Sequence, residues 1–179
     1  MTDRTKLWIS EKMKKIMATK PLDKIRVTEI CHEAEIERPT FYYHFKDKYD
    51  LVAWIFFHDA FKTNILSVES AAKAMNEMRA DYLFYKRAYE DNSQNPLWQY
   101  MHEYFVDRYS VEAMRILDTD RLDTQILYSI RLYCYGCVGM TREWLMNDNI
   151  TPAETIVEMM FHSMPENMKR IYGLSPVRP

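Results

Sequence analysis

The chain has 179 residues, of which 47% are hydrophobic, so it can bury a core in one or two domains and is too apolar to be disordered. Its three glycines argue against glycine-rich phosphate loops and against an all-β fold built on tight turns. The net charge of −2 rules out a generally basic nucleic-acid binder. Residues 1–50 hold 11 Lys and Arg against 9 Asp and Glu, whereas the remainder holds 13 Lys and Arg against 17 Asp and Glu. DNA binding therefore requires basic groups that are focused on one face.

Helical periodicity runs through the first third of the chain. Apolar residues between lysines predict a helix over residues 4–19, and a proline marks the break after it. Two short helices are predicted over 27–34 and 38–44, the second opening at Pro39, which a first helical turn tolerates. A long apolar helix is expected to follow over 48–66.

The rest of the chain is predicted to be helical as well. Helices are expected near residues 68–91, 96–117, 121–147 and 152–171. Pro165 should end or kink the last of them, and no segment alternates with period two for long enough to predict a strand. The expected fold is all-α, with a small N-terminal unit of three helices over 1–47. A long helix joins this unit to a larger helical bundle over 48–179.

The segment IERPTFYYHFKDKYDL, residues 36–51, has few apolar positions for a core and many side chains suited to DNA. Two short helices with a few residues between them form a helix-turn-helix, whose second helix enters the major groove while the first crosses the backbone. Tyrosine hydroxyls, Lys46 and Lys48 can reach phosphates. Thr40 and His44 offer polar groups to base edges.

The same segment contains two phenylalanines at helical spacing. Phe41 and Phe45 lie four residues apart and are expected to face inward, holding the short helix to its neighbours. The alternative to DNA binding is a surface turn between core helices.

Residues 25–51, IRVTEICHEAEIERPTFYYHFKDKYDL, resemble the DNA-binding signature of the TetR family of bacterial transcriptional repressors. The family's Thr-Phe/Leu-Tyr-x-His/Tyr-Phe run and its Lys-x-x-Leu helix start are matched by Thr40, Phe41, Tyr42, His44, Phe45, Lys48 and Leu51. The resemblance covers about residues 4–60 and implies a homodimer that binds an operator in double-stranded DNA. It implies a three-helix helix-turn-helix DNA-binding domain over 1–47 and a helical ligand-sensing and dimerisation domain over 48–179. It also implies DNA contacts by Arg38, Pro39, Thr40, Tyr42, Tyr43 and His44, with Lys46 and Lys48 on the DNA backbone.

Two acidic residues depart from the family pattern. Glu35 stands where the turn usually has Gly, so it is expected to adopt a left-handed conformation at a cost of roughly 1 kcal/mol. Glu37 stands where Ser is frequent, which gives a poorer N-cap and puts negative charge near phosphates. Both departures are expected to weaken DNA affinity.

The C-terminal part loosely resembles a branch of the same family that includes regulators of dihydroxyacetone kinase operons. That branch has a Phe-Tyr-Lys-x-Ala run, an Asn-containing turn and a Tyr-Gly-x-x-Gly…Glu-Trp helix. The matching residues are Phe84, Tyr85, Lys86, Ala88, Asn95, Tyr135, Gly136, Gly139, Glu143 and Trp144. Some regulators of that branch act with a partner protein instead of binding their effector directly.

The last two predicted helices carry more apolar surface than one domain needs. The helix over 121–147 is apolar on two stripes, and the helix over 152–171 has a similar surplus. Two such helices from each chain would make a four-helix interface, so a homodimer is predicted. The alternative is a helix fully buried within one monomer.

A pocket for a small apolar or aromatic ligand is expected among the middle helices, with an apolar wall and a few polar tips. Its candidate lining residues are Tyr85, Tyr89, Trp98, Met101, Phe105, Tyr128, Tyr133 and Met140. An ordinary filled core would explain the same residues.

Other chemical sites find little support in the sequence. Cys134 and Cys137 have redox or zinc spacing but lie mid-helix without a second ligand pair. The pairs His58-Asp59 and His102-Glu103 are common on helices and do not predict a metal site. Without a nucleophile elbow, a phosphate loop or an HExxH run, no enzyme activity, cofactor or metal is expected.

The cysteine count and the hydropathy pattern predict a cellular compartment. Three cysteines without framework spacing suit a reducing environment, and no apolar run nears the ~20 residues of a membrane span. The start of the chain has no signal-peptide core, so a cytoplasmic location without membrane association is expected.

The sequence therefore predicts a repressor that binds a palindromic operator as a homodimer under the control of a small-molecule effector. The main alternative is a regulator that acts through a partner protein and has no effector pocket. A helical enzyme with an unrecognised site is a third class.

Overall fold

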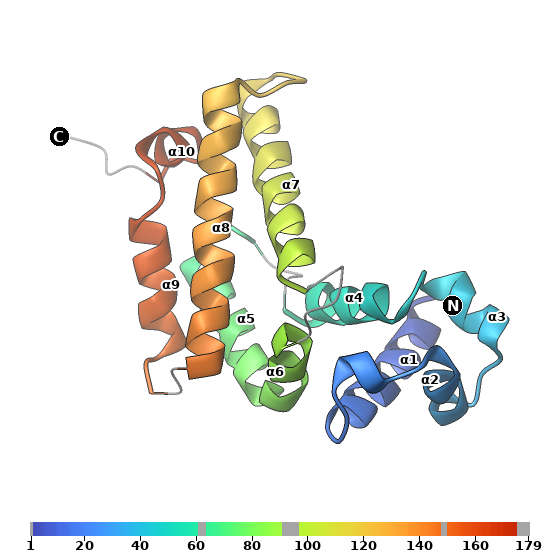
Figure 1. Cartoon of the computed structure of the whole chain (residues 1–179). Coiled ribbons are helices and arrows are strands. Elements are labelled where there is room, and N and C mark those ends of the chain that lie inside the picture. The colour runs from blue at the N-terminus through green and yellow to red at the C-terminus, as the bar shows by residue number, and fades with distance from the viewer. Residues whose placement is uncertain (1, 61–63, 91–96, 148–149, 175–179) are drawn as a thin grey trace. The chain divides into compact units, whose positions relative to one another are not determined.

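Helices make up the regular structure of the chain, which confirms the all-α prediction (Figure 1). The computed structural model describes residues 2–60, 64–90, 97–147 and 150–174, and none of these residues forms a strand. The chain divides into two compact units, Met1–Lys62 with Glu77–Leu97 and Thr63–Asn76 with Trp98–Pro179. The functional division predicted at residue 47 follows a different criterion and stays a prediction.

The first unit is built around its N-terminal helix. Its elements are α1 Thr2–Met17, the 3₁₀ turn η1 Leu22–Lys24, α2 Val27–Ala34, α3 Arg38–His44, α4 Lys48–Ala60, α6 Tyr82–Glu90 and the end of α5 Val68–Ala80. Ile9, Met13 and Met17 follow one another at four-residue spacing on α1 and are fully buried. Because α2, α4 and α6 all pack on α1, this stripe is the centre of the unit's core.

The helix boundaries agree with the sequence in some places and differ in others. The two short helices α2 and α3 have the predicted bounds. The predicted helix 48–66 corresponds to α4, which the structure describes over Lys48–Ala60; residues 61–63 lie outside the described residues, and residues 64–66 are not helical. The predicted helix 68–91 is two helices, α5 and α6, that break at Asp81. The Asp81 carboxylate pairs with Lys14 of α1 at 2.7 Å, a partner 67 residues away. Helical periodicity within a segment cannot reveal a contact with so distant a residue.

The second unit consists of most of α5 together with α7 Leu97–Leu117, α8 Thr124–Asn147, α9 Ala153–His162 and α10 Glu166–Ile171. The long helix α8 packs against both α9 and α10. Pro152 precedes α9 and Pro165 precedes α10, so the expected break at Pro165 is confirmed.

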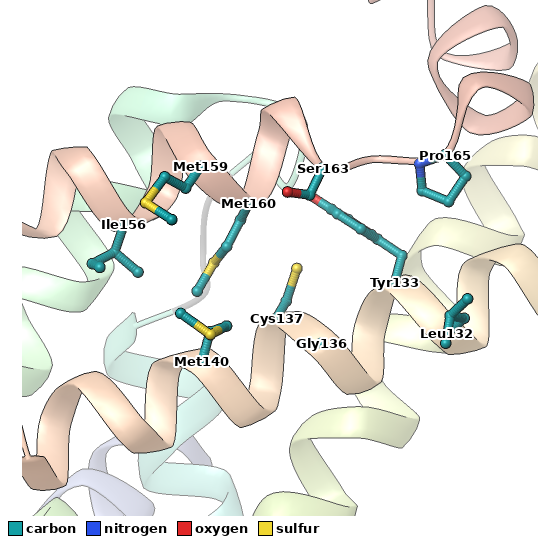
Figure 2. A pocket seen from close by; sticks show the side chains of 10 residues that line it. All are labelled: Leu132, Tyr133, Gly136, Cys137, Met140, Ile156, Met159, Met160, Ser163 and Pro165. Carbon is teal, nitrogen blue, oxygen red and sulfur yellow. The ribbon is translucent and has the colours of Figure 1, made fainter.

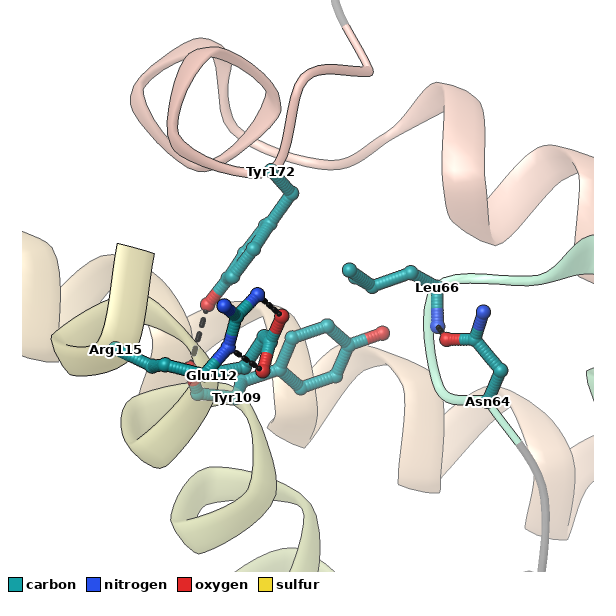
Figure 3. Close-up of polar contacts among 6 residues, drawn as sticks. All are labelled: Asn64, Leu66, Tyr109, Glu112, Arg115 and Tyr172. Carbon is teal, nitrogen blue, oxygen red and sulfur yellow. Dashed lines mark hydrogen bonds and ion pairs between the residues drawn. The ribbon is translucent and has the colours of Figure 1, made fainter. Parts of the chain in front are cut away.

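Three tyrosines tie the core of the second unit together. The Tyr172 hydroxyl donates to the Tyr109 carbonyl at 2.8 Å (Figure 3). The Tyr109 hydroxyl donates to the Ile65 carbonyl at 3.0 Å. Burial raises the pKa of both tyrosines, so both hydroxyls remain protonated donors. Tyr133 packs edge-on against Tyr109 with ring centroids 5.7 Å apart. These contacts join α10 and the segment before α5 to α7.

Among the residues that the structure describes, no helix combines the length and the apolar character that crossing a membrane requires.

Candidate functional site

The turn between α2 and α3 has the backbone conformation that the sequence predicts. Glu35 has φ 54° and ψ 44°, the left-handed region, which costs a residue with a Cβ roughly 1 kcal/mol. The Ile36 N–H bonds to the Cys31 carbonyl at 3.0 Å and the Glu35 N–H bonds to the His32 carbonyl at 3.2 Å. These bonds satisfy the last carbonyls of α2 in the manner of a left-handed helix end.

The inner side of α3 is held by aromatic packing. Phe41 is fully buried and Phe45 nearly so, with ring centroids 5.8 Å apart, as predicted from their spacing. Phe45 also meets Trp54 of α4 edge-on, at 5.9 Å between centroids. The helix therefore turns its opposite face to solvent.

That opposite face holds the predicted DNA contacts. Tyr43 is 78% exposed and Tyr42 is 47% exposed, while Arg38 and Pro39 are exposed at the start of the helix. The Arg38 guanidinium donates to the Tyr42 hydroxyl at 3.5 Å, and this bond raises the pKa of Arg38 above its ordinary value. Thr40, on the same helix, is half-buried.

The helix α3 begins without a side-chain cap. Glu37 occupies the N-cap position and makes no capping hydrogen bond, as expected from the replacement of a good capping residue. Pro39 stands in the first turn, where its missing N–H leaves no unpaired donor.

His44 ends the helix with one ring nitrogen buried. Within the described residues, its Nδ1 has no hydrogen-bond partner. A buried unpaired N–H donor is costly, so the tautomer with the proton on Nε2 is favoured.

The beginning of α4 is capped twice. The Asp47 carboxylate accepts from the Tyr49 and Asp50 N–H groups, both at 2.8 Å, and the Asp50 carboxylate accepts from the Lys46 N–H at 2.9 Å. This reciprocal arrangement fixes the chain direction between α3 and α4 and leaves the Lys46 side chain exposed.

Lys48 has a role that sequence reasoning missed. Its ammonium donates to the carbonyls of Leu22 at 2.8 Å, Asp23 at 3.2 Å and Ile25 at 2.9 Å. The first residue of α4 is thereby bonded to the connection between α1 and α2. Backbone carbonyls 23–26 residues earlier have no side-chain signature, so no sequence pattern could have revealed these bonds.

The eight predicted ligand-binding residues belong to both units. Tyr133 and Met140 line a cavity whose other lining residues were not predicted. Tyr85 and Tyr89 are buried in the first unit, Met101 is buried in α7, and Phe105 packs partly buried on the second unit's core. Trp98 packs on Tyr135 at 6.3 Å between centroids, and Tyr128 is 66% exposed.

The cavity lies between α8 and α9 and has a volume of about 370 Å³ (Figure 2). Its lining residues are Leu132, Tyr133, Gly136, Cys137, Met140, Ile156, Met159, Met160, Ser163 and Pro165. The wall is mostly apolar, with the Ser163 hydroxyl among its few polar groups. Burial raises the pKa of the Cys137 thiol to about 11, so it is a neutral thiol near pH 7.

Two family models match the chain. A model of bacterial regulatory proteins of the tetR family matches residues 13–55. A model of a transcriptional regulator C-terminal region matches residues 68–166, which is more than half of the chain.

The chain belongs to the TetR family of transcriptional regulators. A similar solved structure is the dihydroxyacetone kinase operon activator DhaS, with a TM-score of 0.61 and 17% identity over 93% of this chain and 97% of that one. At that identity the likeness concerns the fold. A comparison with curated proteins found no match.

In this TetR-family chain, metal or thiol chemistry has little structural support. Among the described residues, no group of three or more His, Cys, Asp and Glu side chains is placed to hold a metal ion. All three cysteines are free thiols, and burial raises the pKa of Cys134 as it does that of Cys137.

Proposed function

We propose that this chain represses transcription by binding a palindromic operator in double-stranded DNA as a homodimer, under the control of a small-molecule effector. The observation that carries the proposal is the exposed face of α3, where Arg38, Tyr42 and Tyr43 stand opposite the buried Phe41 and Phe45. A short helix anchored on one side and polar on the other is suited to a DNA groove.

The DNA contacts fall into two groups. Arg38, Pro39, Thr40, Tyr42, Tyr43 and His44 are proposed to enter or border the major groove. Lys46 and Lys48 are proposed to neutralise phosphates at the edge of the groove. The Lys48 ammonium already bonds to three carbonyls, so its proposed part is that of a fixed positive charge.

The homodimer is proposed to form through α8 and α9. Tyr128, Leu132 and Tyr135 on α8 are 66%, 72% and 52% exposed. Gly136 and Gly139 have no atom within 4 Å of the position that a Cβ would take, so a second helix can approach the α8 backbone closely there. A two-fold symmetric dimer would read a two-fold symmetric operator.

The effector, a small apolar or aromatic molecule, is proposed to occupy the cavity at Tyr133 and Met140. The volume of about 370 Å³ suits a ligand of that kind, and the methionine side chains can adapt to its shape. Since α8 also carries the proposed dimer surface, occupancy and subunit association would be linked.

A second candidate function is regulation through a partner protein, without an effector pocket. It is favoured by the lining of the cavity, which does not include the other six predicted ligand residues. The name of the similar structure, an operon activator, supports activation as the outcome in this case. In both candidates the chain has no enzymatic activity or cofactor and acts in the cytoplasm.

Operator binding by the purified protein separates the two candidates. Fluorescence anisotropy with labelled duplexes from the DNA flanking the chain's own gene should reveal binding by the protein alone. Tyr42→Phe should weaken that binding to specific and non-specific duplexes alike, whereas Tyr104→Phe on α7 should not. Binding that requires an added second protein would support the second candidate, and no binding under either condition would overturn both.

A further inference from the structure

Trp8 on α1 reaches the end of α2. Its indole Nε1–H donates to the Ala34 carbonyl at 2.9 Å, a contact between residues 26 positions apart. The Trp8 side chain is 44% exposed, so much of the ring lies outside the core. An aromatic residue in that position is used for its hydrogen bond as well as for its area.

The bonded carbonyl directly precedes the left-handed residue of the helix-turn-helix. Ala34 is the last residue of α2, and Glu35 directly after it is left-handed without being glycine. The next helix, α3, begins at Arg38 without a side-chain cap. The turn therefore lacks two local devices, a glycine and a capping side chain, that would hold it.

The indole is itself held in place. The Lys12 ammonium, one turn further along α1, stands 4.0 Å from the centroid of the Trp8 ring. A Trp side chain has only two rotatable bonds, so a ring fixed by Lys12 and by the Ala34 carbonyl sets the distance between α1 and the turn.

We propose that Trp8 is a positioning residue for DNA recognition, whose indole hydrogen bond holds the left-handed turn at Glu35 and thereby places the start of α3. The proposal rests on the proposed DNA-binding function and deepens it. Trp8 acts through the turn and needs no contact with DNA. A residue that only packed would keep its effect when the N–H is removed and the ring is retained.

The test is a double-mutant cycle between Trp8→Phe and Glu35→Gly. Phe keeps a ring but has no donor, and Gly adopts the left-handed turn without strain. Trp8→Phe alone should lower operator affinity about five-fold, the size of one hydrogen bond. In the Glu35→Gly background the same substitution should lower it less than about two-fold.

Two further readouts separate positioning from general support of the fold. Trp8→Phe should leave non-specific binding and its salt slope unchanged, because no charge is lost. Lys12→Met, which keeps the Trp8 donor, should have a smaller effect on operator affinity than Trp8→Phe. Equal losses of affinity in the wild-type and Glu35→Gly backgrounds, or equal losses of specific and non-specific binding, would overturn the proposal.

Hydrogen exchange measured without DNA tests the role of Trp8 separately from the proposed DNA-binding function. The Trp8 indole N–H should exchange slowly with solvent, and the Trp144 indole, which donates to the Thr151 carbonyl at 2.9 Å, is the internal reference. Trp8→Phe should speed exchange of the Ile36 amide more in the wild-type background than in the Glu35→Gly background. If the protein binds no operator but shows this coupling, the proposed DNA-binding function is wrong, but Trp8 still stabilises the turn at Glu35. Rapid exchange of the Trp8 indole N–H, or no coupling between the two substitutions, would overturn the role of Trp8 in stabilising the turn.

Discussion

Glu35 has a backbone conformation that the sequence predicts and a charge that bears on the proposed DNA binding. The expectation of a left-handed residue came from comparison with a family position that usually holds Gly, and the structure confirms it with φ 54°. The missing cap at Glu37 is confirmed as well. Both residues are exposed, so their negative charges remain available to repel phosphates.

We predict that Glu35→Gly with Glu37→Ser binds the operator several-fold more tightly than wild type at low salt. The substitutions remove four negative charges per dimer, relieve the left-handed strain and supply a cap of roughly 0.5–1 kcal/mol, against the extra unfolded-state entropy of Gly. The advantage should shrink as salt rises, because salt screens the charge effect. A salt series of affinities measures it.

The matched control is Glu35→Gln with Glu37→Gln, which removes the charges but keeps the strain and the weak cap. It should reproduce the salt-dependent part of the gain alone. Equal or weaker binding by the Gly and Ser variant at every salt would show that the acidic residues face away from DNA or accept a specific base contact.

Lys48 is the residue for which the structure adds most to the sequence. We predict two effects of Lys48→Met, which retains an unbranched apolar side chain. Loss of the bonds to Leu22, Asp23 and Ile25 should lower Tm by roughly 3–8 °C, because Lys48 is only partly exposed. Loss of its charge should lower the slope of log affinity against log salt by about 1 per phosphate contact.

Lys46→Met provides the comparison, since the Lys46 side chain is exposed and its contact with Asp50 is made by the backbone N–H. It should change the salt slope with little change in Tm. A Lys48→Met protein with an altered Tm and an unaltered slope would remove Lys48 from the DNA contacts and leave it as a bridge within the fold.

At the scale of elements, helix boundaries marked by neighbouring residues could be predicted from the sequence, whereas a boundary without such a local mark could not. The bounds of α2 and α3 follow from short-range patterns: helical periodicity, Pro39 in a first turn, and turn residues between them. The break at Asp81 has no proline or glycine, and its ion pair with Lys14 is known only once the chain is folded. The structure places this ion pair at the junction of α5 and α6, where the predicted single helix 68–91 is interrupted.

The packing of α7 on α8 buries a titratable group. His102 is 5% exposed, stacks on Tyr135 with ring centroids 3.7 Å apart, and has its Nε2 3.4 Å from the Arg131 carbonyl. Burial is the main cause that lowers the pKa of His102 below 6.5, and the Arg131 charge acts in the same direction. The Arg131 carbonyl and Glu103 oppose this effect.

We predict that the second unit loses stability as pH falls below about 6.5. The unfolded chain binds the proton more readily than the folded chain, so the contribution of His102 is fully present above the unfolded pKa and is lost as pH falls toward the lower folded pKa. Tm should therefore fall as the pH drops below about 6.5 and through the lower folded pKa of His102. The Tm of His102→Phe, which retains a ring to stack on Tyr135, should fall less over this pH range. The Tm of His32→Phe, at an exposed position, should change with pH as the wild type's does.

At the scale of the whole molecule, the two predicted sites differ in how they are encoded. The DNA-contact face of α3 comes from one short segment, so a spacing of residues is sufficient to describe it. The cavity between α8 and α9 combines Tyr133 and Met140 with Ile156 and Ser163, which only the packing of two helices brings together. Aromatic and methionine content predicted adaptable side chains but could not assign them to the core or to a pocket, and Tyr85, expected in a pocket, is buried in the first unit.

We predict a homodimer in solution, with twice the 21.6 kDa mass of the chain. Leu132 is 72% exposed on α8, so Leu132→Arg removes apolar area from the proposed interface with little effect on the fold of one chain. Two like charges would then face each other across a two-fold interface, where burial without a partner is costly. Sedimentation should find the wild type dimeric and the variant mostly monomeric at micromolar concentration. Operator affinity should fall as the dimer is lost, because a monomer contacts one half-site and loses the effective concentration that links the two half-sites.

The matched control is Leu83→Arg, at a 52% exposed position on α6 in the first unit, which should leave the sedimenting mass unchanged. A wild-type protein that sediments as a monomer at micromolar concentration would refute the α8–α9 interface, and the exposed Tyr128, Leu132 and Tyr135 would then be a surface for a different partner.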